Sequence, residues 1–299
     1  MKIFRYMIGN VFNARSMYMQ IRTDSYREDF SKNTYYRFLN SVRTNWFRFT
    51  TLLSAAVAGD FMQRLTSEER KDVFIIDDTL FSRSGYKKTD MVTRVFDHTE
   101  MKYRKGFRLL TLGWSDGNSF LPINFSLLSS NKESNQLGVM ELGDGRTIAG
   151  RRRSMALRKA TDVMLELLDA AMKAGHQTKY VLFDTWFANP HQIVVIKDMG
   201  LDTIAMVKKS SRITYEFEGR RMNSKQIFKQ SKKRRGRSRY LLSVEILVEA
   251  MFQTVKTLFR ATEEQLEVFA ACFYSRLPEY MQRALNYTPY DGPEAISHG

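Results

Sequence analysis

The sequence contains a single cysteine, Cys272, among its 299 residues. One cysteine excludes an internal disulfide, and its apolar neighbours indicate a small core residue rather than a nucleophile. No cysteine and histidine spacing typical of a zinc site occurs. His98 and His191 have no nucleophile near them in the sequence, so a Ser-His-Asp hydrolase is not indicated. The stretch 143–146 matches no nucleotide-binding glycine pattern, so ATP use is not indicated either.

Long hydrophobic runs are also absent. The longest mostly apolar runs, residues 52–58 and 180–183, are far shorter than the roughly 20 residues that a membrane-spanning helix needs. No charged and then apolar leader opens the sequence. The 43% of hydrophobic residues is nevertheless enough to build a buried core. We therefore expect a cytoplasmic protein without a membrane partner.

Positive charge dominates the composition. The chain has 47 Lys and Arg against 32 Asp and Glu, a net charge of +15. Such a surplus favours a polyanionic partner, because each phosphate that a basic side chain neutralises releases condensed counterions. Nucleic acid is the natural candidate, and a ribosomal or membrane surface is the alternative. The densest segment, residues 208–239, has 13 basic and two acidic residues. Its basic run, which we expect to bind DNA, includes Lys232, Lys233, Arg234, Arg235 and Arg237.

The first 70 residues have the apolar spacing of helices, which predicts a small N-terminal helical domain that binds DNA. The spacing is clearest at positions 35, 38, 39 and 42, and again at 49, 52, 53, 56 and 57. A short predicted helix over residues 35–40 combines aromatic and basic side chains. It fits a helix that contacts DNA and equally a helix that only packs.

From residue 73 the pattern changes to short apolar runs that are typical of strands. We predict strands at 73–76, 107–114, 120–128, 179–184 and 202–207, with helices over 157–171 and 191–199. Near-continuous apolar strands flanked by helices indicate a sheet covered on both faces, so residues 71–210 form an α/β core. A basic segment over 211–248 follows, in which residues 240–248 fit a strand or the start of a helix. Residues 249–299 are predicted to be helical.

Two aspartates, Asp77 and Asp184, each follow a hydrophobic strand directly. Ligand groups collect at the carboxyl ends of strands in α/β sheets, so neighbouring strands would place these carboxylates side by side. Mg²⁺ prefers oxygen ligands, and paired ions can activate and stabilise the oxygens of phosphoryl transfer. Asp77 and Asp78 leave a strand on opposite faces. We favour Asp77 as the ligand and expect Asp78 to cap a following turn, although either aspartate alone fits a turn.

Several longer segments resemble the catalytic domain of bacterial insertion-sequence transposases of the aspartate-aspartate-glutamate (DDE) cut-and-paste type. They are residues 74–80, 83–88, 95–99, 105–117 and 181–187, and residues 34–39 resemble the N-terminal region of that family. The resemblance implies a ribonuclease-H-like mixed sheet flanked by helices, with an N-terminal helical domain and a C-terminal helical tail. It also implies Mg²⁺-dependent (or Mn²⁺-dependent) cleavage and strand transfer of double-stranded DNA at element ends, by a homodimer on DNA. Asp77 and Asp184 match the first two members of the metal-binding triad.

The third carboxylate of that triad has only a partial match. The signature of the family runs Tyr-x2-Arg-x3-Glu-x6-Lys on a helix, and Glu249 with Lys256 fits only its second half. Leu242 and Glu245 occupy the tyrosine and arginine positions. Glu249 follows Asp184 by only 249 − 184 = 65 residues, which suggests an internal deletion near residues 239–245. The chain is therefore either an active transposase that uses Glu249 or an inactive DNA-binding remnant, with a host ribonuclease-H-like nuclease as a weaker third interpretation.

Basic residues after the first aspartate are further candidates for DNA contacts. Lys87, Lys88 and Arg94 could bind the phosphates of the transposon end, and a solvated loop is the alternative. Trp114 and Trp186 could stack on an unpaired base, but tryptophans beside apolar strands are more typical of a core.

Overall fold

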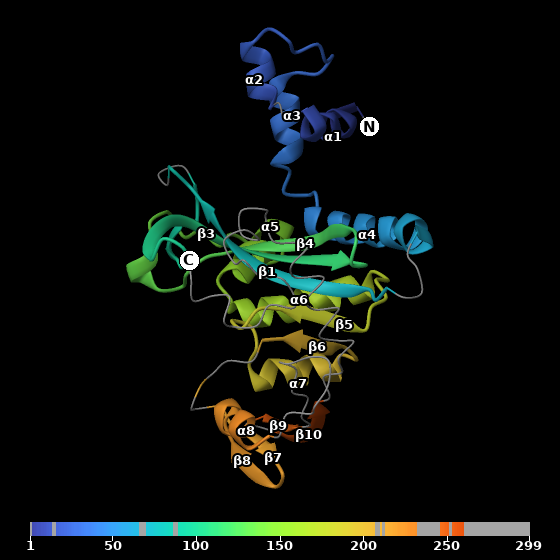
Figure 1. Ribbon diagram of the computed structural model, residues 1–299. Helices are drawn as coiled ribbons and strands as arrows, with labels where there is room; N and C mark the ends of the chain where they lie inside the picture. Colours follow the sequence, from blue (N-terminus) through green and yellow to red (C-terminus); the bar gives the residue numbers. More distant parts are fainter. Residues whose placement is uncertain are drawn as a thin grey trace, which may run out of the picture. The chain divides into compact units, whose positions relative to one another are not determined.

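The computed structural model describes residues 2–13, 16–65, 70–85, 89–206, 210, 213–231, 246–250 and 253–259. The chain divides into two compact units (Figure 1). The first contains Met1–Asn45 and Gly143–Arg151, and the second contains Trp46–Leu142 and Arg152–Gly299. None of the helices in these described ranges is long and apolar enough to cross a membrane.

The first unit is built from α1 (Lys2–Asn13), α2 (Met17–Arg22) and α3 (Lys32–Leu39). Tyr6 is only 8% exposed and packs edge-on against the rings of Tyr26, Phe30 and Tyr35. The Ser31 side chain accepts a hydrogen bond from the Thr34 backbone, so α3 begins earlier than the apolar spacing predicted. A small aromatic core thus joins α1, the segment between α2 and α3, and α3.

The second unit contains a mixed sheet with the order β2-β3-β1-β5-β6, in which β4 also pairs with β3. Its strands are β1 (Val73–Ser82), β2 (Thr93–Asp97), β3 (Lys102–Ser115), β4 (Phe120–Leu128), β5 (Tyr180–Phe183) and β6 (Asp202–Ala205). β1 runs antiparallel to β3 and parallel to β5. This arrangement confirms the predicted ribonuclease-H-like mixed sheet. β2 was not predicted, because its five residues contain only two apolar ones, Val95 and Phe96, and form neither an apolar run nor an alternating pattern.

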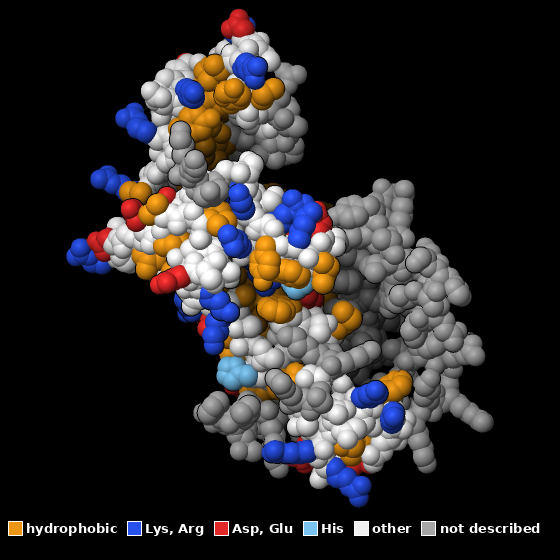
Figure 2. All heavy atoms as spheres, turned by 90° about the vertical axis from the view of Figure 1, so that its left-hand side faces the viewer, with side chains coloured by type: hydrophobic (Ala, Val, Ile, Leu, Met, Phe, Trp, Pro, Cys, Tyr) orange, Lys and Arg blue, Asp and Glu red, His pale blue; other side chains and the backbone are white. Residues whose placement is uncertain are grey.

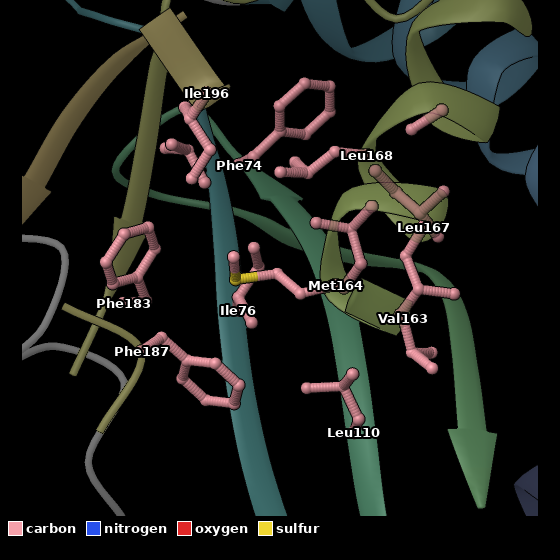
Figure 3. Close-up of a cluster of buried hydrophobic side chains, with 14 of the residues drawn as sticks. Phe74, Ile76, Leu110, Val163, Met164, Leu167, Leu168, Phe183, Phe187 and Ile196 are labelled. Atoms are coloured by element: carbon pink, nitrogen blue, oxygen red, sulfur yellow. The ribbon is translucent and has the colours of Figure 1, made fainter. Parts of the chain in front are cut away.

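One face of the sheet packs against α6 (Ala160–Lys173) (Figures 1 and 3). Phe74 and Ile76 of β1 meet Val163, Met164 and Leu167 of α6, and all five side chains are at most 2% exposed. Burying one such side chain contributes about 1.5–3 kcal/mol. The alternate residues of β1 and β5, Val73 and Leu182, form a smaller buried cluster with Ile204. The period of two along β1 therefore places Asp77 on the face of Val73 and Asp78 on the face of Phe74.

Helix α4 (Trp46–Val57) does not bury the face that its apolar spacing suggested. Thr51 and Ser54 are its buried residues, whereas Leu52 and Leu53 are both 47% exposed. The Thr51 hydroxyl accepts a hydrogen bond from the Asn124 amide at 3.2 Å, and the Ser54 hydroxyl lies 3.0 Å from His176 Nε2. These polar contacts attach α4 to the second unit, so the predicted domain boundary at residue 70 falls inside that unit.

The remaining described elements are short. They are α5 (Ile148–Ala156), α7 (Pro190–Asp198), α8 (Ser224–Gln230), the helical turns Ala58–Met62, Gln63–Leu65 and Glu133–Asn135, and the strands β7 (Tyr215–Phe217), β8 (Arg220–Met222), β9 (Ile246–Ala250) and β10 (Gln253–Phe259). The last four strands form a second sheet with the order β10-β9-β7-β8.

The second sheet corrects one expectation about the end of the chain. Residues 249–250 and 253–259 lie in strands, not in the helical region predicted to begin at residue 249. β-branched and aromatic residues are frequent in residues 253–259, and such residues favour strands. Cys272, the rest of the C-terminal region from residue 260, and the site of the inferred deletion at 239–245 lie outside the described residues.

Candidate active site

β1 and β5 are neighbouring strands of the sheet (Figure 1). Their register brings Asp77 and Asp184 to the same place. The parallel register between β1 and β5 pairs Val73 with Tyr180 and ends with Ile76 opposite Phe183. Asp77 and Asp184 are the next residues of the two segments. Neighbouring strands lie about 4.8 Å apart, so these two backbones carry their carboxylates side by side.

The position of Asp77 differs in one respect from the prediction, because β1 does not end there. The strand continues to Ser82 and stays paired with β3, in which Gly106 lies opposite Ser82. A Cβ atom at Gly106 would lie 2.2 Å from the Phe81 carbonyl oxygen, so this close pairing requires glycine. The candidate site therefore lies where β5 ends and β1 continues.

Asp77 is exposed to solvent, but neighbouring protein partly desolvates its carboxyl group. This partial burial is the main cause that raises its pKa, and the negative charges of Asp78 and Asp184 raise it further. The backbone N–H of Asp78 donates to Asp77 Oδ1 at 2.8 Å and acts in the opposite direction. Among the described ion pairs, none involves Asp77. Its negative charge is therefore poorly compensated.

Asp184 begins the turn that follows β5. Its Oδ1 accepts a hydrogen bond from the Trp186 backbone N–H at 2.9 Å, which is the geometry of an Asx turn. This bond fixes the orientation of the carboxylate. Within the described ranges no hydrogen bond is recorded to its Oδ2, so that oxygen can accept another ligand.

Asp78 does not cap a turn, contrary to our expectation, because no turn follows it within β1. Its carboxylate instead pairs with Arg108 of β3, with the guanidinium Nε 2.7 Å from Oδ2. Burial raises the pKa of Asp78 and the charge of Asp184 adds to this, whereas Arg108 and His98 lower the pKa. Asp184 thus lies within electrostatic reach of both Asp77 and Asp78.

Arg108 is the residue at this site that the sequence did not reveal. Its guanidinium lies over the ring of Trp186, 5.1 Å from the ring centre. Trp186 is 47% exposed, so the expectation of a core tryptophan is wrong there, whereas Trp114 is fully buried as expected. The sequence did contain one indication of its role, because Arg108 is the single charged residue in the apolar run 107–114. Arg108 connects the second carboxylate of β1 to an exposed aromatic ring beside Asp184.

The donor set suits a hard divalent cation. Carboxylate oxygens are the ligands that Mg²⁺ and Mn²⁺ prefer. A cation between Asp77 and Asp184 would relieve the repulsion that adds to the effect of burial on the pKa of Asp77. Within the described ranges, no three His, Cys, Asp or Glu side chains come close enough together to hold a metal ion. Among the described residues, Asp77 and Asp184 thus offer two carboxylates, fewer than the three ligands of the DDE triad. Glu249 lies in β9, and its side chain is outside the described part of the structure.

Most of the predicted DNA-contacting residues cannot be placed. Lys87, Lys88 and the basic run of residues 232–237 lie outside the described residues. Arg94 is exposed on β2, directly opposite Lys105 of β3. The surface in Figure 2 carries many Lys and Arg side chains and fewer acidic ones, in agreement with the net charge of +15.

Most of the chain matches a known protein family. The family of the DDE superfamily endonucleases matches residues 7–267, a range that includes Asp77, Asp184 and Glu249. No curated protein matches the sequence. The family match covers well over half of the 299 residues and agrees with the mixed sheet and its adjacent aspartates. The chain therefore belongs to the DDE superfamily endonucleases.

Proposed function

We propose that this protein is a DNA transposase that cleaves DNA at the ends of an insertion sequence and joins the freed end to target DNA. The observation that carries the proposal is the parallel register of β1 and β5, which sets Asp77 beside Asp184 within a DDE endonuclease fold. The surplus of positive charge supports a DNA substrate. By resemblance to such transposases, a pair of protomers would act on two DNA ends.

In this proposal Asp77 and Asp184 hold Mg²⁺ or Mn²⁺ through their carboxylate oxygens, and Glu249 is the third ligand. A bound divalent cation would stabilise the charge that develops on the phosphate and make a water or hydroxyl a better nucleophile. The protein fixes Asp77 within a paired strand and holds Asp184 by the Trp186 N–H. Arg108 pairs with Asp78, which supports Asp77 as the metal-binding member of the two neighbours.

A second candidate function is an inactive remnant that binds DNA without cutting it. The position of Glu249 favours this alternative, because the residue lies in β9 whereas the family signature expects a helix. The remnant would still occupy element ends, since its basic residues do not depend on the triad. It would fail at cleavage, because two carboxylates complete only part of the ligand set.

Cleavage of the natural element ends distinguishes the two functions. Duplexes that span the junctions between the element and its flanking DNA are incubated with the full chain and Mg²⁺ or Mn²⁺. We expect strand nicks at the junctions, and we expect none when EDTA removes the cation. Salt-sensitive binding without nicks would support the remnant. Absence of both binding and nicks at low salt would contradict both functions.

A further inference from the structure

One face of α3 is polar, basic and open to solvent. Asn33, Tyr36, Arg37 and Asn40 follow one another at intervals of three, one and three residues, which places them on one side of the helical path. All four are exposed, and together they line a hollow of about 540 Å³. The opposite side of the helix carries Tyr35, whose ring packs against Tyr6. The core thus fixes α3 in one rotation and turns this face outward.

The polar groups on this face are not engaged by the rest of the first unit. Among the described hydrogen bonds and ion pairs, none uses the side chains of Asn33, Arg37 or Asn40. The ring of Tyr36 makes a T-shaped contact with that of Tyr35, and within the described part of the chain its hydroxyl makes no hydrogen bond. Polar side chains are common on any solvated helix face, so the feature that distinguishes this one is the hollow that its four side chains share. The face therefore has the character of a recognition surface.

The side chains on this face have the chemistry that reads base pairs. Arginine donates two parallel hydrogen bonds to guanine, and asparagine pairs in the same bidentate way with adenine in the major groove. An α-helix with its side chains is about 10–12 Å wide, which fits the major groove of about 12 Å. The eight residues of α3 extend about 12 Å along the axis and could reach three to four base pairs.

The charge of the surrounding segment favours duplex DNA over an uncharged or cationic partner. Residues 1–45 contain eight Lys and Arg against three Asp and Glu. Basic residues beside the reading helix can contact the phosphates on either side of the groove. A-form RNA is a poorer fit, because its major groove is too narrow and deep for side chains to read.

We infer that α3 is the base-reading helix of the protein, and that Arg37, flanked by Asn33 and Asn40, selects the DNA sequence at the element end through the major groove. The inference rests on the proposed function, for which it names the recognition element. It places sequence choice in the first unit and leaves Asp77 and Asp184 to the cleavage step.

The test is a selection of bound sequences from a randomised duplex DNA pool, with the full chain in EDTA so that no cleavage occurs. We expect the unmodified protein to enrich one sequence motif. Arg37→Ala should lower the preference at one G·C position about tenfold or more. Arg37→Lys should bind duplex DNA with nearly unchanged overall affinity but lose the same preference, because lysine keeps the charge and not the bidentate geometry. Asn33→Ala and Asn40→Ala should relax other positions.

Arg22→Ala is the matched control, since Arg22 is an exposed arginine of the same unit at the end of α2. It should weaken binding to all sequences alike and leave the motif unchanged. The inference is overturned if the unmodified protein enriches no motif, if the α3 variants enrich the same motif as the unmodified protein, or if the chain prefers single-stranded DNA or duplex RNA. A different result would show that the proposed function fails while the inference holds. In that case the protein would select a motif but would not nick a duplex carrying that motif when metal is present.

Discussion

Asp184→Asn is expected to lower metal-dependent cleavage of element-end DNA roughly a thousandfold. Asparagine keeps the shape of the side chain and its bond to the Trp186 N–H, but it removes the negative charge that would hold the cation. Loss of about 4 kcal/mol of charge stabilisation corresponds to three powers of ten in rate. Asp77→Asn should have a similar effect, because Asp77 stands in register beside Asp184. The measurement is the rate of nicking at saturating protein and Mg²⁺.

Asp169→Asn is the control for this loss. Asp169 is half exposed on α6 and pairs with Lys173 one helical turn away, so its removal should leave nicking unchanged. Unaltered nicking by Asp184→Asn would show that this carboxylate is not part of the metal site. Loss of nicking by all three variants would point to a general requirement for acidic charge.

The stability of Asp77→Asn without metal reports whether the variant folds. Because burial raises the pKa of Asp77, the folded state favours the neutral carboxyl, and ionisation at neutral pH costs stability. The cost is absent below the pKa of the unfolded state and appears as the pH rises through the raised pKa of the folded state. At pH 7.5, Asp77→Asn should therefore unfold at a slightly higher temperature than the unmodified protein. The difference between the two unfolding temperatures should disappear in acid, where Asp77 is neutral in both states.

The second large effect concerns acid stability and His176. His176 is 7% exposed in the second unit, and its Nε2 lies 3.0 Å from the Ser54 hydroxyl of α4. Burial lowers its pKa from 6.5 to about 4. The neutral ring therefore stabilises the fold fully above pH 6.5, and this stability is lost as the pH falls toward 4. The difference of 6.5 − 4 = 2.5 pKa units corresponds to about 3 kcal/mol.

His176→Gln should remove most of this acid sensitivity. Glutamine can still donate a hydrogen bond to Ser54 but gains no charge in acid. Urea unfolding between pH 7.5 and pH 4.5 would show a shallower loss of stability in the variant, whatever offset the substitution itself introduces. His191→Gln, at an exposed position on α7, should keep the slope of the unmodified protein. Equal slopes for His176→Gln and the unmodified protein would contradict a buried neutral His176.

The sequence predicted the elements that depend on local patterning. Apolar runs ahead of Asp77 and Asp184 indicated two buried strands, and the structure pairs those strands in parallel. The helix over α6 and the antiparallel pair β3 and β4 followed from spacing and from the turn between them. These features depend on period and turn chemistry, which a single sequence displays.

The features that were missed depend on partners far away in the sequence. The pairing of Arg108 with Asp78 crosses from β3 to β1, and the bond from Ser54 to His176 joins residues 122 positions apart. The same distant contact turns the polar side of α4 inward and leaves Leu52 exposed. β2 forms because β3 offers it an edge, although its own residues have little strand signal. Glu249 as third ligand and the inferred deletion stay predictions.

The central claim is that Asp77 and Asp184 together hold a hard divalent cation, and direct metal binding tests it most simply. Mn²⁺ titration of the full chain, followed by electron paramagnetic resonance, counts bound ions without DNA and without turnover. We predict a site in the unmodified protein that Asp77→Asn and Asp184→Asn each weaken about tenfold or more, because each removes one charged ligand. Mn²⁺ binding that is equally tight in all three proteins would contradict the account.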